Sequence, residues 1–175
     1  MKQRRLRLYG DPVLLAKSLP IMKIDDDVEE LVLDMMDTIK KYGGLGLAAP
    51  QLGESVRVIV IQLPEQKERI IINPVIRNQS DDMVKSIEGC LSLPGVIHEV
   101  ARPSWVEIDY QDIEGNVVEY ELLKDTEACV FFHEFDHLEG KLLTFHMSSI
   151  HKSLATKKLR NINKYNKLLT KSERT

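Results

Sequence analysis

The feature that most constrains this chain is the five-residue segment His133-Glu134-Phe135-Asp136-His137. Residues four apart on an α-helix lie on one face, about 6 Å apart along its axis. His133 and His137 can therefore converge on one metal ion, with Glu134 beside the open coordination position as a general base. Apolar neighbours predict that one side of this helix is buried: Val130, Phe131, Phe135 and Leu138.

The segment alone leaves the third metal ligand open. The candidates are the remaining histidines, the cysteines and nearby carboxylates: His98, His146, His151, Cys90, Cys129 and Glu139 among them. No residue downstream of His137 stands at the metzincin spacing. Cys90 lies upstream, between glycine and turn-forming residues that can hold a thiolate in a fixed direction. A lone buried cysteine is more often a small hydrophobic residue, so this assignment depends on what accompanies it.

Hydrophobic periodicity predicts three helices. The first covers 25–42, with aspartates at its start and Gly43 after its end. The second covers about 126–139 and contains the histidine segment, with Gly140 after it. The third covers about 148–170 and places an apolar stripe along one face: Ile150, Leu154, Ile162, Tyr165 and Leu169.

The strand signals are short and irregularly placed. A small-residue loop over 43–53 precedes strands over 56–61 and 69–72, and Asn73-Pro74 closes the second. Two further strands, over 105–110 and 117–122, flank Glu114-Gly115-Asn116 and suggest a hairpin. Because strands and helices do not alternate, we expect an α+β fold with largely antiparallel β-sheets around a central metal-binding helix, together with an N-terminal helix and a C-terminal helix.

Length and composition bound the remaining possibilities. The 175 residues suit one domain, 1–175, with a single core. No stretch has the apolar length of a membrane span, and no apolar run follows the charged N-terminus as a secretory signal would require. With two cysteines, a reducing compartment is expected. The last 25 residues are strongly basic, which fits either a solvated helix face or contact with an anionic partner such as RNA.

Three segments in order resemble the three signature motifs of the peptide deformylases. Gly44-Leu45-Gly46-Leu47-Ala48-Ala49-Pro50-Gln51 resembles G-x-G-x-A-A-x-Q, Glu88-Gly89-Cys90-Leu91-Ser92 is identical to E-G-C-L-S, and the histidine segment matches H-E-x-D-H. The similarity extends from Gly10-Asp11-Pro12 to the final helix. Many members carry glutamine where this chain has Phe132 and arginine where it has Leu15, and neither change removes a ligand or the base.

The resemblance implies a catalytic centre. One divalent ion would be bound by Cys90, His133 and His137, with water in the fourth position. The family typically works with Fe²⁺, and Zn²⁺, Ni²⁺ or Co²⁺ are the alternatives. Glu134 would move the proton, and the Gln51 amide and the Leu91 N–H would stabilise the oxyanion. The residues implied to line the peptide site are Leu45, Gly46, Ile87, Gly89 and Cys129, with His133 as a further wall.

The implied reaction removes the formyl group from the N-terminal formylmethionine of nascent polypeptides and releases formate. The basic C-terminal helix would then support docking on the ribosome, and no membrane or sequence-specific nucleic acid is expected as a partner. A bacterial cytoplasm is the expected location, with an organellar origin left open.

Two secondary expectations and two alternatives complete the prediction. The resemblance suggests a buried Glu88–Arg102 ion pair holding the Cys90 loop, and Asp136 either orients a ligand histidine, braces its own helix or is merely solvated. A zinc endopeptidase would cleave internal peptide bonds without needing Cys90. A catalytically idle homologue would be expected to lose a ligand or the base, and this chain keeps both.

Overall fold

The structure, a computed structural model, describes residues 4–172. In this range the helices are α1 Asp26–Tyr42, α2 Asp125–Leu138 and α3 Ser149–Ser172, with short 3-10 helices η1 Pro12–Leu15, η2 Ala49–Leu52 and η3 Leu143–His146. The strands are β1 Gly46–Ala48, β2 Val58–Ile61, β3 Arg69–Gln79, β4 Met83–Cys90, β5 Leu93–Pro103, β6 Trp105–Gln111 and β7 Val117–Lys124.

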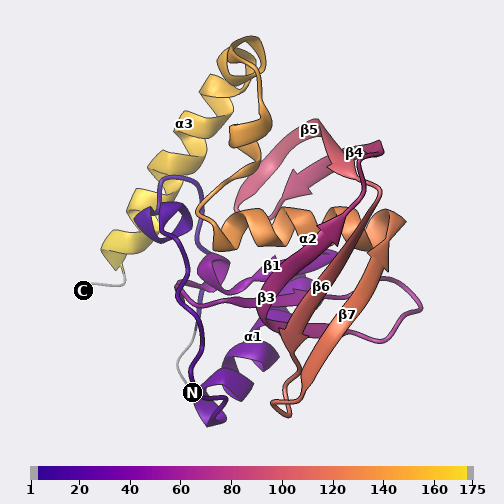
Figure 1. The fold of residues 1–175 in the computed structure, drawn as a ribbon. Helices are drawn as coiled ribbons and strands as arrows, with labels where there is room; N and C mark the ends of the chain where they lie inside the picture. The colour runs from indigo at the N-terminus through magenta and orange to yellow at the C-terminus, as the bar shows by residue number, and fades with distance from the viewer. Residues whose placement is uncertain (1–3, 173–175) are drawn as a thin grey trace.

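The strands form one larger sheet and one hairpin. The sheet has the order β1-β2-β3-β6-β7, and every neighbouring pair in it is antiparallel. β4 and β5 pair only with each other, also antiparallel. Figure 1 shows α2 between this hairpin and the larger sheet. The predicted α+β class with antiparallel sheets is confirmed.

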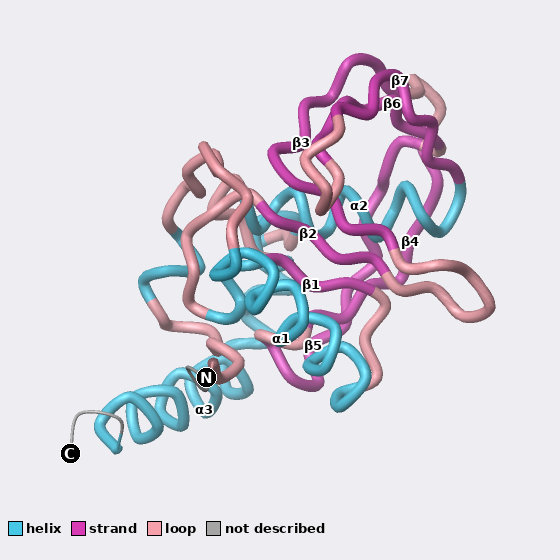
Figure 2. The backbone as a smooth tube through the Cα atoms, turned by 90° about the horizontal axis from the view of Figure 1, so that it is seen from below, coloured by secondary structure: helices cyan, strands magenta, loops and turns pink. Residues whose placement is uncertain are grey.

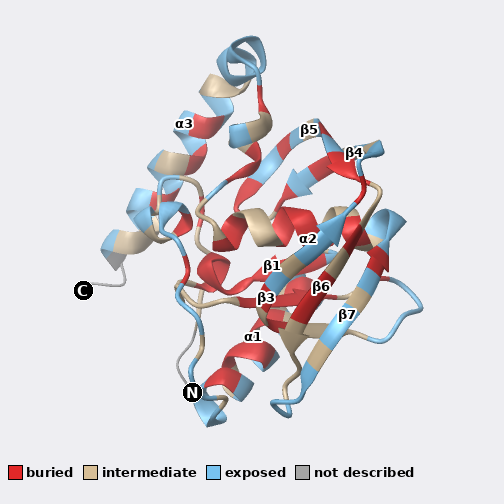
Figure 3. Ribbon diagram, in the orientation of Figure 1, coloured by how far each residue is buried: buried red, intermediate tan, exposed pale blue. Residues whose placement is uncertain are grey.

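Alternation along β2 explains why the sheet carries a helix on each face. Ile59 and Ile61 belong to the apolar cluster that contains the buried residues of α2, whereas Val58 and Val60 belong to the cluster formed with α1. Successive side chains of a strand point to opposite faces, so α1 and α2 lie on opposite sides of the sheet. All four residues of β2 are buried, as colouring by burial shows (Figure 3).

The predicted N-terminal helix is confirmed, and its ends follow its sequence. The Asp25 carboxylate accepts a hydrogen bond from the N–H of Val28 at 3.4 Å, which satisfies a donor that the first turn leaves open. At the other end Gly43 adopts a left-handed conformation with φ +73°, which glycine reaches without steric cost.

The third helix is confirmed in extent, but of the predicted apolar stripe only Ile162 and Leu169 lie on its buried face. Ile150, Leu154 and Tyr165 are 70%, 77% and 56% exposed, while Ile162 is buried. The buried face is shifted and runs through Ala155, Leu159, Ile162, Asn166 and Leu169. It packs on β5 and the N-terminal segment in a third apolar cluster, so α3 lies to one side of the sheet (Figures 1 and 2).

The strand predictions need three corrections. β3 does not end at Asn73-Pro74 but continues to Gln79, because a register shift between Ile72 and Val75 absorbs the proline. Asn73 sits there at φ +54°, and its side chain bonds the backbone N–H and C=O of Ile21 at 2.8 and 2.7 Å. The β4–β5 hairpin was not predicted, and the expected loop over 43–53 contains β1 and η2.

No helix within residues 4–172 is long and apolar enough to cross a membrane.

The two positions that depart from the family pattern lie in different surroundings. Phe132 is 8% exposed and lies in the apolar cluster around α2, where an aromatic ring contributes burial. Leu15 is 66% exposed at the end of η1.

Candidate active site

Three potential metal ligands meet between α2 and the end of β4. The ligand atoms of Cys90, His133 and His137 all lie within 4.8 Å of one another, and Cys90 Sγ is 3.2 Å from Nε2 of His137. The two histidines are one helical turn apart on α2, and Cys90 follows a register shift that breaks the β4–β5 ladder after Gly89. All three side chains are buried. A thiolate with two imidazoles suits a transition-metal ion, and three protein donors leave a coordination position for water or substrate.

The two imidazoles are held differently. Nδ1 of His133 lies 2.9 Å from Oε2 of Glu88, so an Nδ1–H donor leaves Nε2 free to bind a metal. Burial opposes protonation of His133, but Cys90 and Glu88 outweigh it and raise its pKa well above the usual value. Burial, reinforced by His133 and Arg102, lowers the pKa of His137 well below the usual value. Nδ1 of His137 has no hydrogen-bond partner among residues 4–172.

Glu134 is 4% exposed and lies beside the ligand cluster. Burial raises the pKa of its carboxyl to about 7, and its Oε2 accepts no hydrogen bond from the described part of the chain. Gly46 on β1 makes room for it: a Cβ at position 46 would stand 3.0 Å from both Cγ and Oε1 of Glu134. An unpartnered carboxylate oxygen with a pKa near neutrality is suited to accept and return a proton.

Gln51 is held with its amide nitrogen towards Cys90. Its Oε1 accepts a hydrogen bond from the N–H of Ala48 at 2.8 Å, which fixes the side chain within η2. Nε2 then points to Ser92 Oγ at 3.3 Å and Cys90 Sγ at 3.7 Å. Leu91 lies in the two-residue turn between β4 and β5, directly after Cys90. The sequence did not indicate that Ser92, which is fully buried, would contact Gln51.

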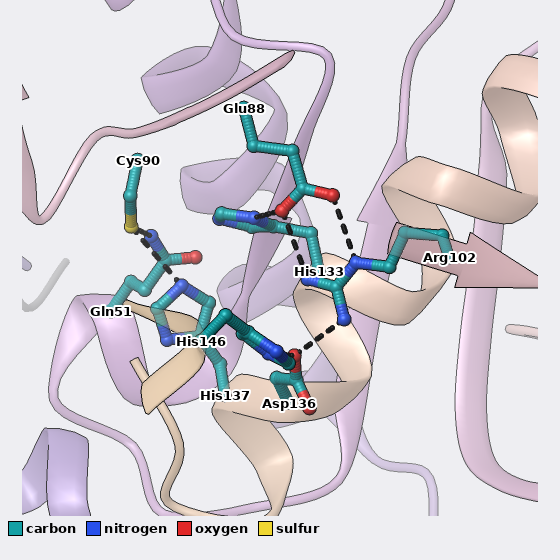
Figure 4. A network of polar contacts seen from close by, with 8 residues as sticks. All are labelled: Gln51, Glu88, Cys90, Arg102, His133, Asp136, His137 and His146. Atoms are coloured by element: carbon teal, nitrogen blue, oxygen red, sulfur yellow. Dashed lines mark hydrogen bonds and ion pairs between the residues drawn. The ribbon is translucent and has the colours of Figure 1, made fainter. Parts of the chain in front are cut away.

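A polar network extends from His133 away from the ligand cluster (Figure 4). Arg102 donates to both carboxylate oxygens of Glu88, at 2.8 and 2.9 Å, so the predicted buried ion pair is confirmed. Burial alone would raise the pKa of Glu88, but hydrogen bonds from Arg102 and His133 lower it to about 2. Asp136 accepts from Arg102 and from His146, each at 2.7 Å, rather than orienting a ligand histidine directly.

The other histidines lie outside the cluster of potential metal ligands. Nε2 of His98 lies 3.3 Å from the carbonyl oxygen of His146, and the rings of His98 and His151 are 5.0 Å apart, edge to face. Within residues 4–172 only Cys90 and the two α2 histidines form a cluster of three potential ligands. No motif spacing marked His146, which joins the network through tertiary contact.

The residues expected to line the peptide site lie on β1, β4 and α2 and, for Leu45, in the loop just before β1. Leu45 and Ile87 are 42% and 79% exposed, and Gly89 is exposed on β4. Gly46 is buried against Glu134. Cys129 is half-buried on α2, and burial raises the pKa of its thiol. Their contact with a substrate stays a prediction.

Comparison with known proteins agrees with these motifs. The family model described as polypeptide deformylase matches residues 3–153. A peptide deformylase of Maricaulis maris is 39% identical over 168 residues, covering 94% of this chain and 96% of that protein. One from Dictyoglomus thermophilum is 43% identical over 140 residues, covering 80% and 90%.

The fold is shared with solved structures. Peptide deformylase from Plasmodium falciparum matches with a TM-score of 0.87 and 38% identity, covering 94% of this chain and 98% of that chain. The enzyme from Thermus thermophilus gives a TM-score of 0.87 and 36% identity, covering 92% and 98%. With the family model spanning most of its length and relatives matched almost end to end, this chain belongs to the polypeptide deformylase family of enzymes.

Proposed function

We propose that this protein is a metal-dependent hydrolase that removes the formyl group from the N-terminal formylmethionine of nascent polypeptides and releases formate. The observation that carries the proposal is the meeting of Cys90, His133 and His137 within 4.8 Å, with Glu134 buried beside them, in a chain of the deformylase family.

Cys90, His133 and His137 would hold one divalent ion. When bound, such an ion acts as a Lewis acid that polarises a carbonyl oxygen and acidifies a water molecule. We favour Fe²⁺, with Zn²⁺, Ni²⁺ or Co²⁺ able to replace it, because thiolate and imidazole donors suit all four. Glu88 supports this role, since it holds His133 in the tautomer that leaves Nε2 free.

Glu134 would carry the proton. It removes one from the attacking water and later delivers it to the amine nitrogen as the formyl C–N bond breaks, so that formate and a free amino terminus leave. Its position supports this role, because Oε2 is buried without a partner among residues 4–172 and the side chain lies against Gly46.

Gln51 and Leu91 would stabilise the oxyanion that develops on the formyl oxygen. The Ala48 N–H fixes the Gln51 amide, so its Nε2 donor is oriented before the substrate arrives. The Leu91 backbone N–H would be the second donor. A site this close to buried side chains would favour formyl over larger acyl groups.

The peptide itself would lie along Leu45, Gly46 and Gly89, with Ile87 and Cys129 beside the methionine side chain. Gly89 supports this because a side chain there would point into open space, with only Val96 O at 3.9 Å from an added Cβ. A bare backbone at that position allows another chain to approach closely.

The test is formate release from a short formyl-Met peptide by metal-loaded protein. The parent should release formate, and Glu134→Gln, which keeps the volume of the buried side chain, should lose most of the activity. The same preparations are incubated with an internally cleavable peptide without a formyl group. Absence of formate from the parent, equal rates from both proteins, or cleavage of the internal bonds would refute the proposal.

Oxygen sensitivity tests the choice of metal. A ferrous ion with a thiolate ligand should be lost or oxidised in air, so protein purified anaerobically should contain more iron and be more active. Equal iron content and equal activity after aerobic and anaerobic purification would contradict this sensitivity to oxidation.

We also propose that α3 docks on the ribosome in the bacterial or organellar compartment where formylated chains are made. Its exposed face carries seven cations: Lys152, Lys157, Lys158, Arg160, Lys164, Lys167 and Lys171. Contact with ribosomal RNA predicts co-sedimentation with ribosomes that weakens as salt rises. Co-sedimentation unchanged by reversing several of these charges would contradict it.

A further inference from the structure

The polar network behind His133 ends on His146, a residue that the proposed mechanism does not use. His146 is the last residue of η3, in the connection between α2 and α3. Its side chain is 24% exposed, and its Nε2 lies 2.7 Å from Oδ2 of Asp136. The side chain thus has a defined partner rather than solvent alone.

Four consecutive polar contacts join His146 to the candidate ligand His133 (Figure 4). After the His146–Asp136 contact, Nη1 of Arg102 donates to the same Oδ2 of Asp136 at 2.7 Å. Nε and Nη2 of Arg102 donate to the two oxygens of Glu88, and Oε2 of Glu88 lies 2.9 Å from Nδ1 of His133. All these lengths are those of charge-assisted hydrogen bonds.

We propose that His146 is a positioning residue that fixes Asp136 and, through Arg102 and Glu88, sets the orientation of His133. The proposal rests on the proposed role of His133 as a metal ligand. Asp136 is 16% exposed, so without a second donor its carboxylate can turn towards water. Of its two carboxylate partners, Arg102 would then keep only Glu88. Because a guanidinium group is a rigid plane, a tilt of the Arg102 guanidinium would also move the Glu88 carboxylate.

The contrast between the two ligand histidines shows why this network matters. Nδ1 of His137 has no hydrogen-bond partner among residues 4–172, whereas Nδ1 of His133 is bonded to Glu88. The network is therefore the polar device in the described structure that orients a ligand ring from behind. Loosening it should weaken metal binding and the chemical step more than substrate binding.

Two amide variants separate the hydrogen bond from His146 to Asp136 from the shape of the His146 side chain. In His146→Gln the amide nitrogen can take the place of Nε2 and still donate to Asp136. In His146→Asn the amide nitrogen takes the place of Nδ1 and stops short of Asp136. His146→Leu, which keeps bulk without any donor, replaces His146→Asn if that variant does not fold. Phe145→Ala, at a neighbouring residue 62% exposed, is the control for changes in η3.

The readouts are the dissociation constant of the apoprotein for Co²⁺, the visible spectrum of the Co²⁺ form, and kcat and KM for the formyl peptide. His146→Gln and Phe145→Ala should match the parent. His146→Asn should bind Co²⁺ about 3–10-fold more weakly, less than the roughly 10–100-fold typical of losing a direct partner of a ligand. Its kcat should fall with KM unchanged, and its spectrum should shift.

Two results would overturn the proposal. One is that His146→Asn binds Co²⁺ as tightly as the parent and has the same spectrum. The other is that Co²⁺ binding is weakened equally in His146→Gln and His146→Asn, because a purely structural role of the His146 ring predicts equal weakening. If the parent releases no formate while His146→Asn still binds Co²⁺ more weakly than His146→Gln, the proposed function fails and the positioning role of His146 stands.

Discussion

Gly46 gives the sharpest prediction about catalysis, because a side chain at this position would press on Glu134. A Cβ added at position 46 would stand 2.8 Å from Cγ1 of Val130 and 3.0 Å from Cγ and Oε1 of Glu134. Carbon atoms attract best at about 3.5–4.0 Å, so Gly46→Ala leaves a shortfall of roughly 0.7–1.2 Å at Val130. The same Cβ leaves a shortfall of roughly 0.5–1.0 Å at Cγ of Glu134, which must be met by moving Glu134.

The magnitude follows from this overlap. Overpacking of a core costs about 1–3 kcal/mol, and replacing glycine by alanine returns about 0.4–1 kcal/mol through the unfolded chain. We expect a net loss of about 0.5–2 kcal/mol in the free energy of unfolding. A 1 Å misplacement can cost about 100-fold in rate, so a shift of about half that predicts a roughly 10-fold lower kcat.

The assay combines urea unfolding, metal content and formate release, with two comparison variants. Gly44→Ala is the matched control, because its added Cβ would meet the flexible end of Leu91, at 3.2 Å from Cδ1, and would stand at an ordinary 3.5 Å from the backbone oxygen of Gly46. In Gly46→Ala/Val130→Ala the closest contact is removed, so stability should recover while kcat stays low. A kcat for Gly46→Ala equal to that of the parent, with equal metal content, would refute the placement of Glu134 against Gly46.

Three further predictions concern stability. Arg102→Met should lower the free energy of unfolding by about 3–5 kcal/mol, since it leaves Glu88 buried and charged. The double variant Arg102→Met/Glu88→Met should recover much of that loss, and equal losses in the single and double variants in urea unfolding would contradict this. Gly140→Ala should cost more than Gly43→Ala, because both have positive φ but only the former would place a Cβ 2.6 Å from the carbonyl oxygen of Leu15; equal unfolding midpoints would argue against that contact. Removing the metal with a chelator should lower the melting temperature, because an ion at about 100 times its dissociation constant stabilises the folded state by about 2.7 kcal/mol, and an unchanged temperature would count against a bound ion.

Local signals in the sequence predicted the elements that depend on local physics. The first helix has its cap at Asp25 and its stop at Gly43, and both act in the structure as expected. Proline and glycine misled the strand predictions instead. Asn73-Pro74 reads as a strand end, yet a bulge and the Asn73 side chain accommodate it. Pro94-Gly95 similarly reads as a turn, so β5 was not predicted. Its pairing with β4 depends on tertiary context.

The phase of α3 failed for a related reason. Apolar residues occur on more than one side of this helix, so periodicity alone allows several stripes. The observed face includes the polar Asn166, which is buried and accepts hydrogen bonds from Arg5 and Thr170. A buried polar residue with distant partners cannot be recognised from hydrophobic spacing.

In the candidate site, too, the sequence predicted the features that depend on local structure and missed those that depend on tertiary contacts. The spacing of His133 and His137 is a property of one helical turn, so the sequence predicted their convergence. The bracing of His133 is not local: its partner Glu88 is 45 residues away, and Arg102 reaches Asp136 across 34 residues. The resemblance to the family supplied the Glu88–Arg102 pair, whereas the sequence offered His146 only as a candidate third metal ligand and gave no sign of its contact with Asp136.

The unpredicted β4–β5 hairpin therefore connects the candidate ligand Cys90 with the residues that support the candidate ligand His133. It carries Cys90 at the end of one strand, Glu88 two residues earlier, and Arg102 on the partner strand opposite Val84. Because Glu88 and Cys90 are two residues apart, both point to the face that meets α2, while Gly89 between them is exposed. A slip of one residue in the ladder that ends at Gly89 would turn Glu88 away from α2. Cys90 pairs with Leu93 only after the register shift, so the ladder sets the brace of His133 while the shift and the turn that follows set the candidate ligand Cys90.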